Sequence, residues 1–317
     1  MTTTVNLIVT CTKKKTRIVP KSLHIRELAV GSCRERVREW LDRLAETDEE
    51  RETVESLYAG DHWSVARDLH GMRRSGFEVR TWVASAGWGL LGIDEKVQPY
   101  SATFSRGHED SVVTDGVLAS EWWGQLTDRH GRSVRSLAAQ NPRSPILVAA
   151  STTYLRAMHQ DLIDAVKELE TDHLSIVSAG TRTLKGLDRH LLPCDARMKS
   201  CVGGALRSLN VRVAKRLLSG TNKLIPFYPN LRERLQKDLE KQPALVNFDR
   251  KPMEDSEIQE YMAAAIKENA QMTHSRLLRQ FRDDGNACEQ GRFRGLFRQL
   301  QEQLGLNANP IVLGEEG

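Results

Sequence analysis

The chain has few cysteines, and their arrangement excludes several kinds of site. Its 317 residues contain only five, an odd number without a C-x-x-C pair. This composition argues against a disulfide framework and against a common structural zinc site. The nine histidines show no spacing typical of metal ligands, and His108-Glu109-Asp110 is best interpreted as a solvated loop. We therefore expect no metal site.

Long apolar runs are also missing. No run approaches the ~20 residues that are needed to span a bilayer, and the N-terminus lacks the long apolar segment of a secretory signal. With 39% hydrophobic and 28% charged residues, the composition is that of a globular protein. These features predict a cytoplasmic protein of roughly two domains with no membrane partner.

Phosphate-binding signatures are absent as well. Neither a G-x-G-x-x-G nor a Walker pattern occurs, and the pair Gly203-Gly204 at a predicted helix start is only a weak signal. We therefore expect no dinucleotide, ATP or other cofactor. The net charge of +4 is mild and does not by itself indicate a nucleic-acid partner, although no acidic residue precedes Glu27.

The most informative stretch that is present runs from Leu7 to Lys15 and reads LIVTCTKKK. Its apolar, β-branched first part is too short for a helix and predicts a buried strand. In open α/β sheets ligands bind beyond the carboxyl ends of the strands, which is where Cys11 and the three lysines would lie. A nearby ammonium stabilises a thiolate, which is the nucleophilic form of cysteine. The alternative is a small buried cysteine followed by a solvated basic loop.

A similar pattern recurs later in the chain. A predicted strand over residues 77–84 ends at Ser85-Ala86-Gly87, and another over residues 174–177 ends at Ser178-Ala179-Gly180. Two strand–helix–strand passages that both close on Ser-Ala-Gly predict a mostly parallel sheet with flanking helices and with both tips at one edge. Chance similarity between short strands is the alternative. We expect residues 1–220 to form an α/β domain that binds a ligand or carries out catalysis.

The C-terminal part has a helical pattern. Glycine and proline predict a linker over residues 221–232, and residues 233–317 are expected to form an all-helical domain. Two predicted helices, joined by a short turn with a glycine, have the size of a helix-turn-helix. Its arginines either contact DNA phosphates or form a solvated face. The candidates for nucleic-acid binding are Arg276, Arg279, Arg292 and Arg294.

Several of these stretches together resemble a known family. They are the strand ending in Cys11, Leu57-Tyr58 with Trp63, the run from Ser85 to Leu90 followed by Pro99-Tyr100, Val177 to Gly180, and Ala287 to Gln290 with Arg292-Phe293. The chain resembles bacterial proteins loosely related to the YaaA family, often labelled queuine or archaeosine tRNA-ribosyltransferase-like. Among these it is most similar to the DpdC-type proteins of systems that place 7-deazaguanines in DNA. The resemblance covers roughly residues 5–220 and 273–300.

This resemblance implies an enzyme that modifies a base already in nucleic acid. The 7-cyano group of the deazaguanine preQ0 in DNA would be hydrated to the amide. Cys11 would add to the nitrile, while Lys14 or Lys15 would favour its thiolate or protonate the imidate nitrogen. Asp195 or Glu289 would activate water as a general base. Asp195 has an ordinary alternative role, which is to cap a turn.

The resemblance also implies contacts with the base itself. An enzyme that acts on a paired base normally flips it out of the helix into a pocket. Polar and glycine residues would read the edge of the base, and an aromatic side chain would stack on it. The residues implied are Ser85, Gly87, Ser178 and Gly180 for the edge, and Trp88 or Tyr100 for stacking.

Two other functions fit the same sequence. One is a non-catalytic component that binds DNA or senses a nucleotide in a stress or phage-defence system. The other is an enzyme that acts on a free nucleoside without contacting DNA. In either DNA-linked function, other proteins of a modification or defence operon would be partners besides DNA.

Overall fold

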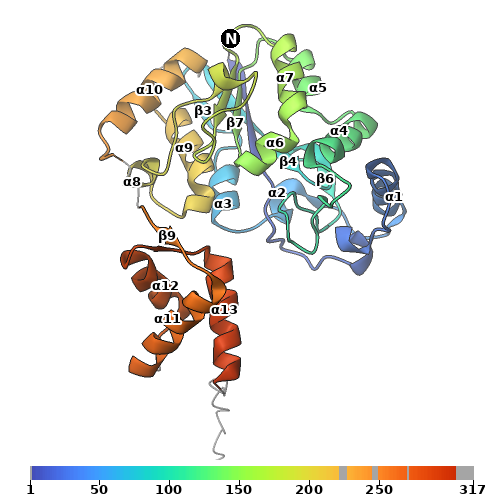
Figure 1. Ribbon diagram of the computed structural model, residues 1–317. Coiled ribbons are helices and arrows are strands. Elements are labelled where there is room, and N and C mark those ends of the chain that lie inside the picture. The colour runs from blue at the N-terminus through green and yellow to red at the C-terminus, as the bar shows by residue number, and fades with distance from the viewer. Residues whose placement is uncertain (1, 221–226, 245–248, 270, 305–317) are drawn as a thin grey trace, which may run out of the picture. The chain divides into compact units, whose positions relative to one another are not determined.

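The computed structural model describes residues 2–220, 227–244, 249–269 and 271–304 (Figure 1). The chain forms two compact units, residues 1–244 and 245–317. The boundary therefore lies beyond the predicted linker, of which residues 221–226 fall outside the described residues. Helix α10 (Tyr228–Glu240), expected in the linker and the helical domain, belongs to the first unit. The reason is its apolar stripe of Leu231, Leu235 and Leu239, which is buried in the core of that unit.

A mostly parallel sheet forms the centre of the first unit. Strands β4, β1, β7 and β8 are parallel, and β3 and β5 pair with β4 in the antiparallel sense. The predicted α/β class is therefore confirmed. The order across the sheet, with β5 also paired to β4, is β3 (Arg73–Arg74), β4 (Phe77–Ser85), β1 (Thr3–Thr10), β7 (Ile146–Ala149), β8 (Leu174–Val177); β5 is Gly89–Gly92.

Strand β1 lies in the interior of this sheet because its central residues are mostly apolar. Residues Val5 to Val9 are buried without interruption, which is typical of a parallel strand covered on both faces. The one polar residue among them, Asn6, accepts a hydrogen bond from Trp82 Nε1 at 2.9 Å. The chain leaves the apolar core at the carboxyl end of β1, where Cys11 follows.

The two Ser-Ala-Gly tips share that edge, but they are not neighbours. Strands β4 and β8 lie on the outer sides of β1 and β7, so two strands separate their tips. At about 4.8 Å per strand this puts the tips roughly 14 Å apart. The register instead places Val9 opposite Val83 on one side and Ala149 on the other. The residues that follow β1 and β7 are therefore the ones that meet.

Helices cover the sheet on both sides (Figure 1). On one side α9 (Leu209–Leu218) contacts β7 and β8 and also packs with α10 and α3 (Asp61–Arg67). The elements on the other side are α1 (Cys33–Glu46), α4 (Ala119–His130), α5 (Val134–Gln140) and α7 (His159–Glu168). The short elements are α2 (Val54–Leu57), α6 (Thr152–Ala157), α8 (Met198–Val202) and the pair β2 (Glu52–Thr53) with β6 (Lys96–Val97). In the part of the chain that the structure describes, no helix combines the length and the apolar character needed to cross a membrane.

In its described residues, the second unit consists of three helices around an apolar core. They are α11 (Asp255–Glu268), α12 (His274–Asp283) and α13 (Gln290–Gln303), with a two-residue pairing of β9 (Lys251–Pro252) and β10 (Asn286–Ala287). Phe281 and Phe293 meet at a ring-centroid distance of 5.3 Å, which joins α12 to α13. The side chain of Thr273 caps α12 by accepting the N–H of Arg276. Helices thus occupy both predicted stretches.

Asp161 joins three helices of the first unit. Its carboxylate accepts a hydrogen bond from Trp123 Nε1 of α4 at 2.8 Å. It also accepts the N–H groups of Val134 and Arg135, each at 2.9 Å, at the start of α5. Burial raises the pKa of Asp161, and these three donors act against that rise.

We expect Asp161→Ala to lower the free energy of unfolding by about 3 kcal/mol, because three N–H donors lose their acceptor. Asp164 on the same helix serves as the control, since its carboxylate bonds only to side chains of its own helix, Lys167 at 2.6 Å and Gln160 at 3.2 Å. Asp164→Ala should cost less than ~0.5 kcal/mol. Urea unfolding measures both values, and equal losses would contradict the role of Asp161.

Candidate functional site

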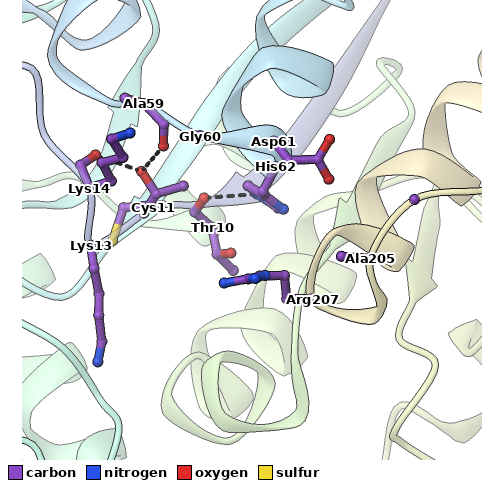
Figure 2. A pocket seen from close by; sticks show the side chains of 12 residues that line it. Thr10, Cys11, Lys13, Lys14, Ala59, Gly60, Asp61, His62, Ala205 and Arg207 are labelled. Carbon is purple, nitrogen blue, oxygen red and sulfur yellow. Dashed lines mark hydrogen bonds between the residues drawn. The ribbon is translucent and has the colours of Figure 1, made fainter. Parts of the chain in front are cut away.

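Cys11 follows β1 directly, and its side chain lines a pocket. Its N–H donates to the carbonyl of Ala84 at 3.0 Å, which continues the pairing of β1 with β4. The side chain is half-buried and lines a cavity of about 630 Å³ (Figure 2). Cavities of this size are typical of small-molecule sites. The thiol is therefore open to a ligand rather than enclosed in the core.

The basic loop after Cys11 is paired with the loop before α3. Lys15 and Tyr58 form an isolated antiparallel bridge, and the N–H of Ala59 donates to the carbonyl of Lys14 at 3.0 Å. The hydroxyl of Thr12 donates to the carbonyl of Ala59 at 3.1 Å (Figure 2). This pairing gives neighbouring lysines different positions. Lys13 and Lys14 are exposed and line the pocket, whereas Lys15 points into the protein.

Lys15 is the lysine whose charge is coupled to Cys11. Its Nζ donates to the carbonyl of Thr12 at 2.7 Å and lies 4.8 Å from the ring centroids of both Tyr58 and Tyr100. Burial lowers the pKa of Lys15, and the charge of a Cys11 thiolate raises it. Between the two lysines expected to act on the thiol, the geometry favours Lys15, while Lys14 stays at the pocket wall.

Tyr154 is the second group beside the thiol. It lies in the first turn of α6, after β7, and its hydroxyl is 3.0 Å from Cys11 Sγ. Burial, first of all, and the charge of Cys11 raise the pKa of Tyr154 well above its ordinary value. The phenol therefore keeps its proton and can donate it as a hydrogen bond to a thiolate.

A chain of hydroxyl groups lies beneath Lys15. Ser85 Oγ accepts the N–H groups of Gly87 and Trp88, both at 3.1 Å, so its own hydrogen is directed to Tyr100, 2.5 Å away. The hydroxyl of Tyr100 then donates to Tyr58 at 2.6 Å. Burial raises the pKa of both tyrosines. These residues fix the rings on which Lys15 rests.

The residues expected to hold the base do not line the Cys11 pocket, which corrects that assignment. They are Ser85, Gly87, Trp88, Tyr100, Ser178 and Gly180. Strand β4 turns directly into β5, and this hairpin encloses the first tip in the core. Ser85 and Tyr100 are fully buried there, and Trp88 packs on His130 with a centroid distance of 5.8 Å. At Gly87 a Cβ would come within 2.6 Å of the Tyr100 ring, so this glycine serves packing rather than ligand approach.

The second tip is also engaged within the protein. Ser178 Oγ is 2.9 Å from the hydroxyl of Thr181, which in turn is 2.8 Å from that of Thr152. Gly180 lies against the same Thr152 hydroxyl. Since β8 is two strands away from β1, these residues support the end of β7 and β8 rather than the thiol.

The carboxylates expected to activate water have other partners. Asp195 receives hydrogen bonds from Arg197 Nε at 3.0 Å and Nη2 at 2.7 Å, and Arg197 lowers the pKa of this carboxyl. It does not line the Cys11 pocket. Glu289 belongs to the second unit, where its side chain caps α13 by accepting the N–H of Arg292 at 2.8 Å. Their positions do not support either residue as the base.

His62 is the residue that sequence reasoning missed. It lies in the first turn of α3 and lines the pocket, with Nε2 donating to the carbonyl of Thr10 at 3.1 Å (Figure 2). Burial lowers the pKa of His62, so the ring is neutral near pH 7. Nδ1 makes no hydrogen bond to any residue that the structure describes, which leaves it free to accept a proton. Its place directly after Gly60-Asp61, close to Tyr58, was the available signal.

The arginines predicted to bind nucleic acid all belong to the second unit. Arg276 and Arg279 are exposed on α12, and Arg294 is exposed on α13. Arg292 is different, because it donates to Asp255 at 2.7 Å and to the carbonyl of Met253 at 3.1 Å. It therefore ties α13 to the start of α11, and we remove it from the set of phosphate-binding candidates.

No three His, Cys, Asp or Glu side chains come together to hold a metal ion within the described ranges. The chain matches no protein-family model, and no curated protein shows significant similarity to it. Its function is therefore inferred from the geometry of the pocket.

We expect Lys15→Met to slow alkylation of Cys11 by iodoacetamide about tenfold at pH 7, because an adjacent ammonium favours the thiolate. Lys14→Met is the matched control and should change the rate less than twofold, since Lys14 is exposed. Mass spectrometry of the Cys11 peptide measures the rate. A larger effect at Lys14 than at Lys15 would reverse the assignment.

Proposed function

We propose that the chain is an enzyme that hydrates the nitrile of a 7-cyano-7-deazaguanine base in DNA, with Cys11 as the nucleophile. The observation that supports this most directly is a half-buried thiol that lines a pocket, with the Tyr154 hydroxyl 3.0 Å away and a buried ammonium nearby. An ammonium and a hydrogen-bond donor beside a thiol favour the nucleophilic thiolate. The resemblance to DpdC-type proteins supports the choice of substrate.

The chemistry requires one water and no redox partner. The thiolate forms a C–S bond with the nitrile carbon, and the nitrogen takes one proton, which gives a thioimidate. Water then adds to the same carbon, and one of its protons passes to the nitrogen. The tetrahedral intermediate carries S, OH and NH2. It loses the hydroxyl proton and breaks the C–S bond, which returns the thiolate and releases the amide.

Each nearby side chain has a role in these steps. Lys15 and Tyr154 stabilise the thiolate before the attack and after the collapse. His62, neutral because burial lowers its pKa, takes a proton from water and passes it to the nitrogen. It replaces Asp195 and Glu289 as the general base. We assign Lys14 neither stabilisation of the thiolate nor proton transfer.

We further propose that α12, the turn and α13 form a helix-turn-helix-like DNA-binding unit. Arg276 and Arg279 on α12 and Arg294 and Arg298 on α13 are exposed. None of the four pairs with a carboxylate among the residues that the structure describes. Cations without internal partners are suited to phosphate contacts. An enzyme that flips a base out of a duplex needs such a surface in addition to its pocket.

Cys11→Ala should lower the rate of nitrile hydration at least ~10³-fold, because the nucleophile is removed. The protein is incubated with DNA that contains the cyano base, and the nucleosides are then quantified by mass spectrometry. Cys194→Ala is the control, since burial raises the pKa of that thiol to about 12 and it lies outside the pocket.

Full activity of Cys11→Ala would reject the nucleophile. DNA binding by the unmodified protein without any new nucleoside would favour the non-catalytic DNA-binding or nucleotide-sensing function instead. Unchanged folding of the variant, checked by circular dichroism, separates both results from simple loss of structure.

Charge reversal on α12 should weaken DNA binding. We expect Arg276→Glu combined with Arg279→Glu to raise the Kd at least tenfold and to reduce the slope of log K against log salt by about 2. Lys251→Glu with Lys267→Glu reverses two exposed charges elsewhere in the same unit and should have a smaller effect. Fluorescence anisotropy with a labelled duplex measures both. If all variants bind DNA alike, the DNA-binding role of α12 is wrong, whereas no binding by the unmodified protein would favour an enzyme that acts on a free nucleoside.

A further inference from the structure

The wall of the Cys11 pocket carries cationic side chains that the nitrile chemistry does not use. We infer that Lys13, Lys14 and Arg207 form a subsite for a phosphate group. The inference deepens the proposed function and rests on it for the identity of the base attached to that phosphate. The presence of the subsite itself follows from charge, pairing and position.

The three cations come from two distant segments and have no internal counterion. Lys13 and Lys14 follow β1, and Arg207 lies in the turn before α9. Across the described part of the chain, none of these side chains pairs with a carboxylate. In Figure 2 the Arg207 guanidinium extends toward Thr10, on the wall of the same cavity as Lys13. Like charges gathered on one cavity repel each other, and an anion within it offsets that cost.

The single acidic residue among those lining the pocket does not supply that anion. Asp61 accepts hydrogen bonds from Ser208 Oγ and from Arg212 Nη2, both at 2.5 Å, and these donors lower the pKa of its carboxyl. His62 is neutral near pH 7 for the reason given above. The positive charge of Lys13, Lys14 and Arg207 therefore remains uncompensated.

The backbone shortly before Arg207 has a left-handed conformation at Gly204. Gly204 has φ +75°, a conformation that other residues rarely adopt, and a side chain there would collide with the Arg212 guanidinium. Arg212 thus passes directly behind the pocket wall while it is paired with Asp61. Substitution of Gly204 would strain the backbone of the turn that precedes Arg207, because of this φ.

Consecutive lysines have different positions relative to the subsite. Lys15 donates to the carbonyl of Thr12 beneath the thiol and does not line the pocket. Lys13 and Lys14 line the pocket instead. Two ammonium groups and one guanidinium match the several oxygens of a phosphate monoester or diester. A nucleotide whose base reaches Cys11 would place its phosphate here.

The charge preference of Cys11 alkylation tests the subsite. Iodoacetate carries a negative charge and iodoacetamide carries none, so the ratio of their rates reports the local potential. Lys13→Gln combined with Arg207→Gln should lower this ratio about fivefold, because two positive charges are removed from the wall of a solvated pocket. Lys96→Gln, an exposed lysine outside the pocket, should leave it unchanged.

Protection experiments then identify the source of the phosphate. Inorganic pyrophosphate and deoxyguanosine 5′-monophosphate should slow alkylation by iodoacetamide, whereas deoxyguanosine at the same concentration should not. The double variant should need at least tenfold more of either compound. Stronger protection by a single-stranded oligonucleotide than by the mononucleotide identifies a nucleic-acid phosphate, and the reverse order identifies a free nucleotide.

Two results would overturn the subsite. One is an unchanged ratio of alkylation rates in the double variant, and the other is equal protection by the nucleotide and the nucleoside. Neither measurement depends on turnover. If nitrile hydration is not observed but phosphate protects Cys11, the proposed reaction fails and the subsite stands.

Discussion

The pairing of the loop after β1 with the loop before α3 determines the rest of the site. Without it, the three lysines that follow Cys11 would form an ordinary solvated run. The bridge between Lys15 and Tyr58, together with the hydrogen bonds from Ala59 and Thr12, directs one ammonium inward and two outward. The inward ammonium lies against the rings of Tyr58 and Tyr100, and the outward ones give the pocket wall its positive charge. The same pairing brings His62 to the carbonyl of Thr10, so it places Cys11, Lys15 and His62 at one site.

The surroundings of Cys11 differ from those of Cys33 and Cys194 in the same unit. Burial raises the pKa of both Cys33 and Cys194 to about 12, which keeps these thiols protonated and unreactive. Cys11 instead lines the pocket and has a protonated phenol and an ammonium beside it. The cost of burying Lys15 is offset by its hydrogen bond to Thr12 and by the faces of two tyrosine rings. These rings are held in turn by Ser85, so the tip of β4 supports the site from beneath rather than contacting the ligand.

In the proposed function, the first unit recognises the base and the second unit contacts DNA phosphates. The first unit has a concave site with few, specifically placed polar groups, as expected for recognition of one base. The second has a compact apolar core and exposed arginines on two helices, which suits contacts with many phosphates. Arg292 illustrates why exposure and charge alone do not define such a surface. It lies among the other arginines in sequence, yet Asp255 engages it and makes it a structural tie within the unit.

The sequence by itself determined the elements and the place of the thiol. The short apolar run before Cys11 predicted a buried strand, and the helices over residues 274–283 and 290–303 were visible in local periodicity. Only the tertiary structure decided the strand order, the assignment of α10 to the first unit, and the partners of the thiol. Tyr154 lies 143 residues from Cys11 in the chain. Asp195 is engaged by the nearby Arg197, and no sequence pattern predicted that ion pair. Local patterns record burial and backbone preference, whereas partnerships between side chains depend on which distant strands become neighbours.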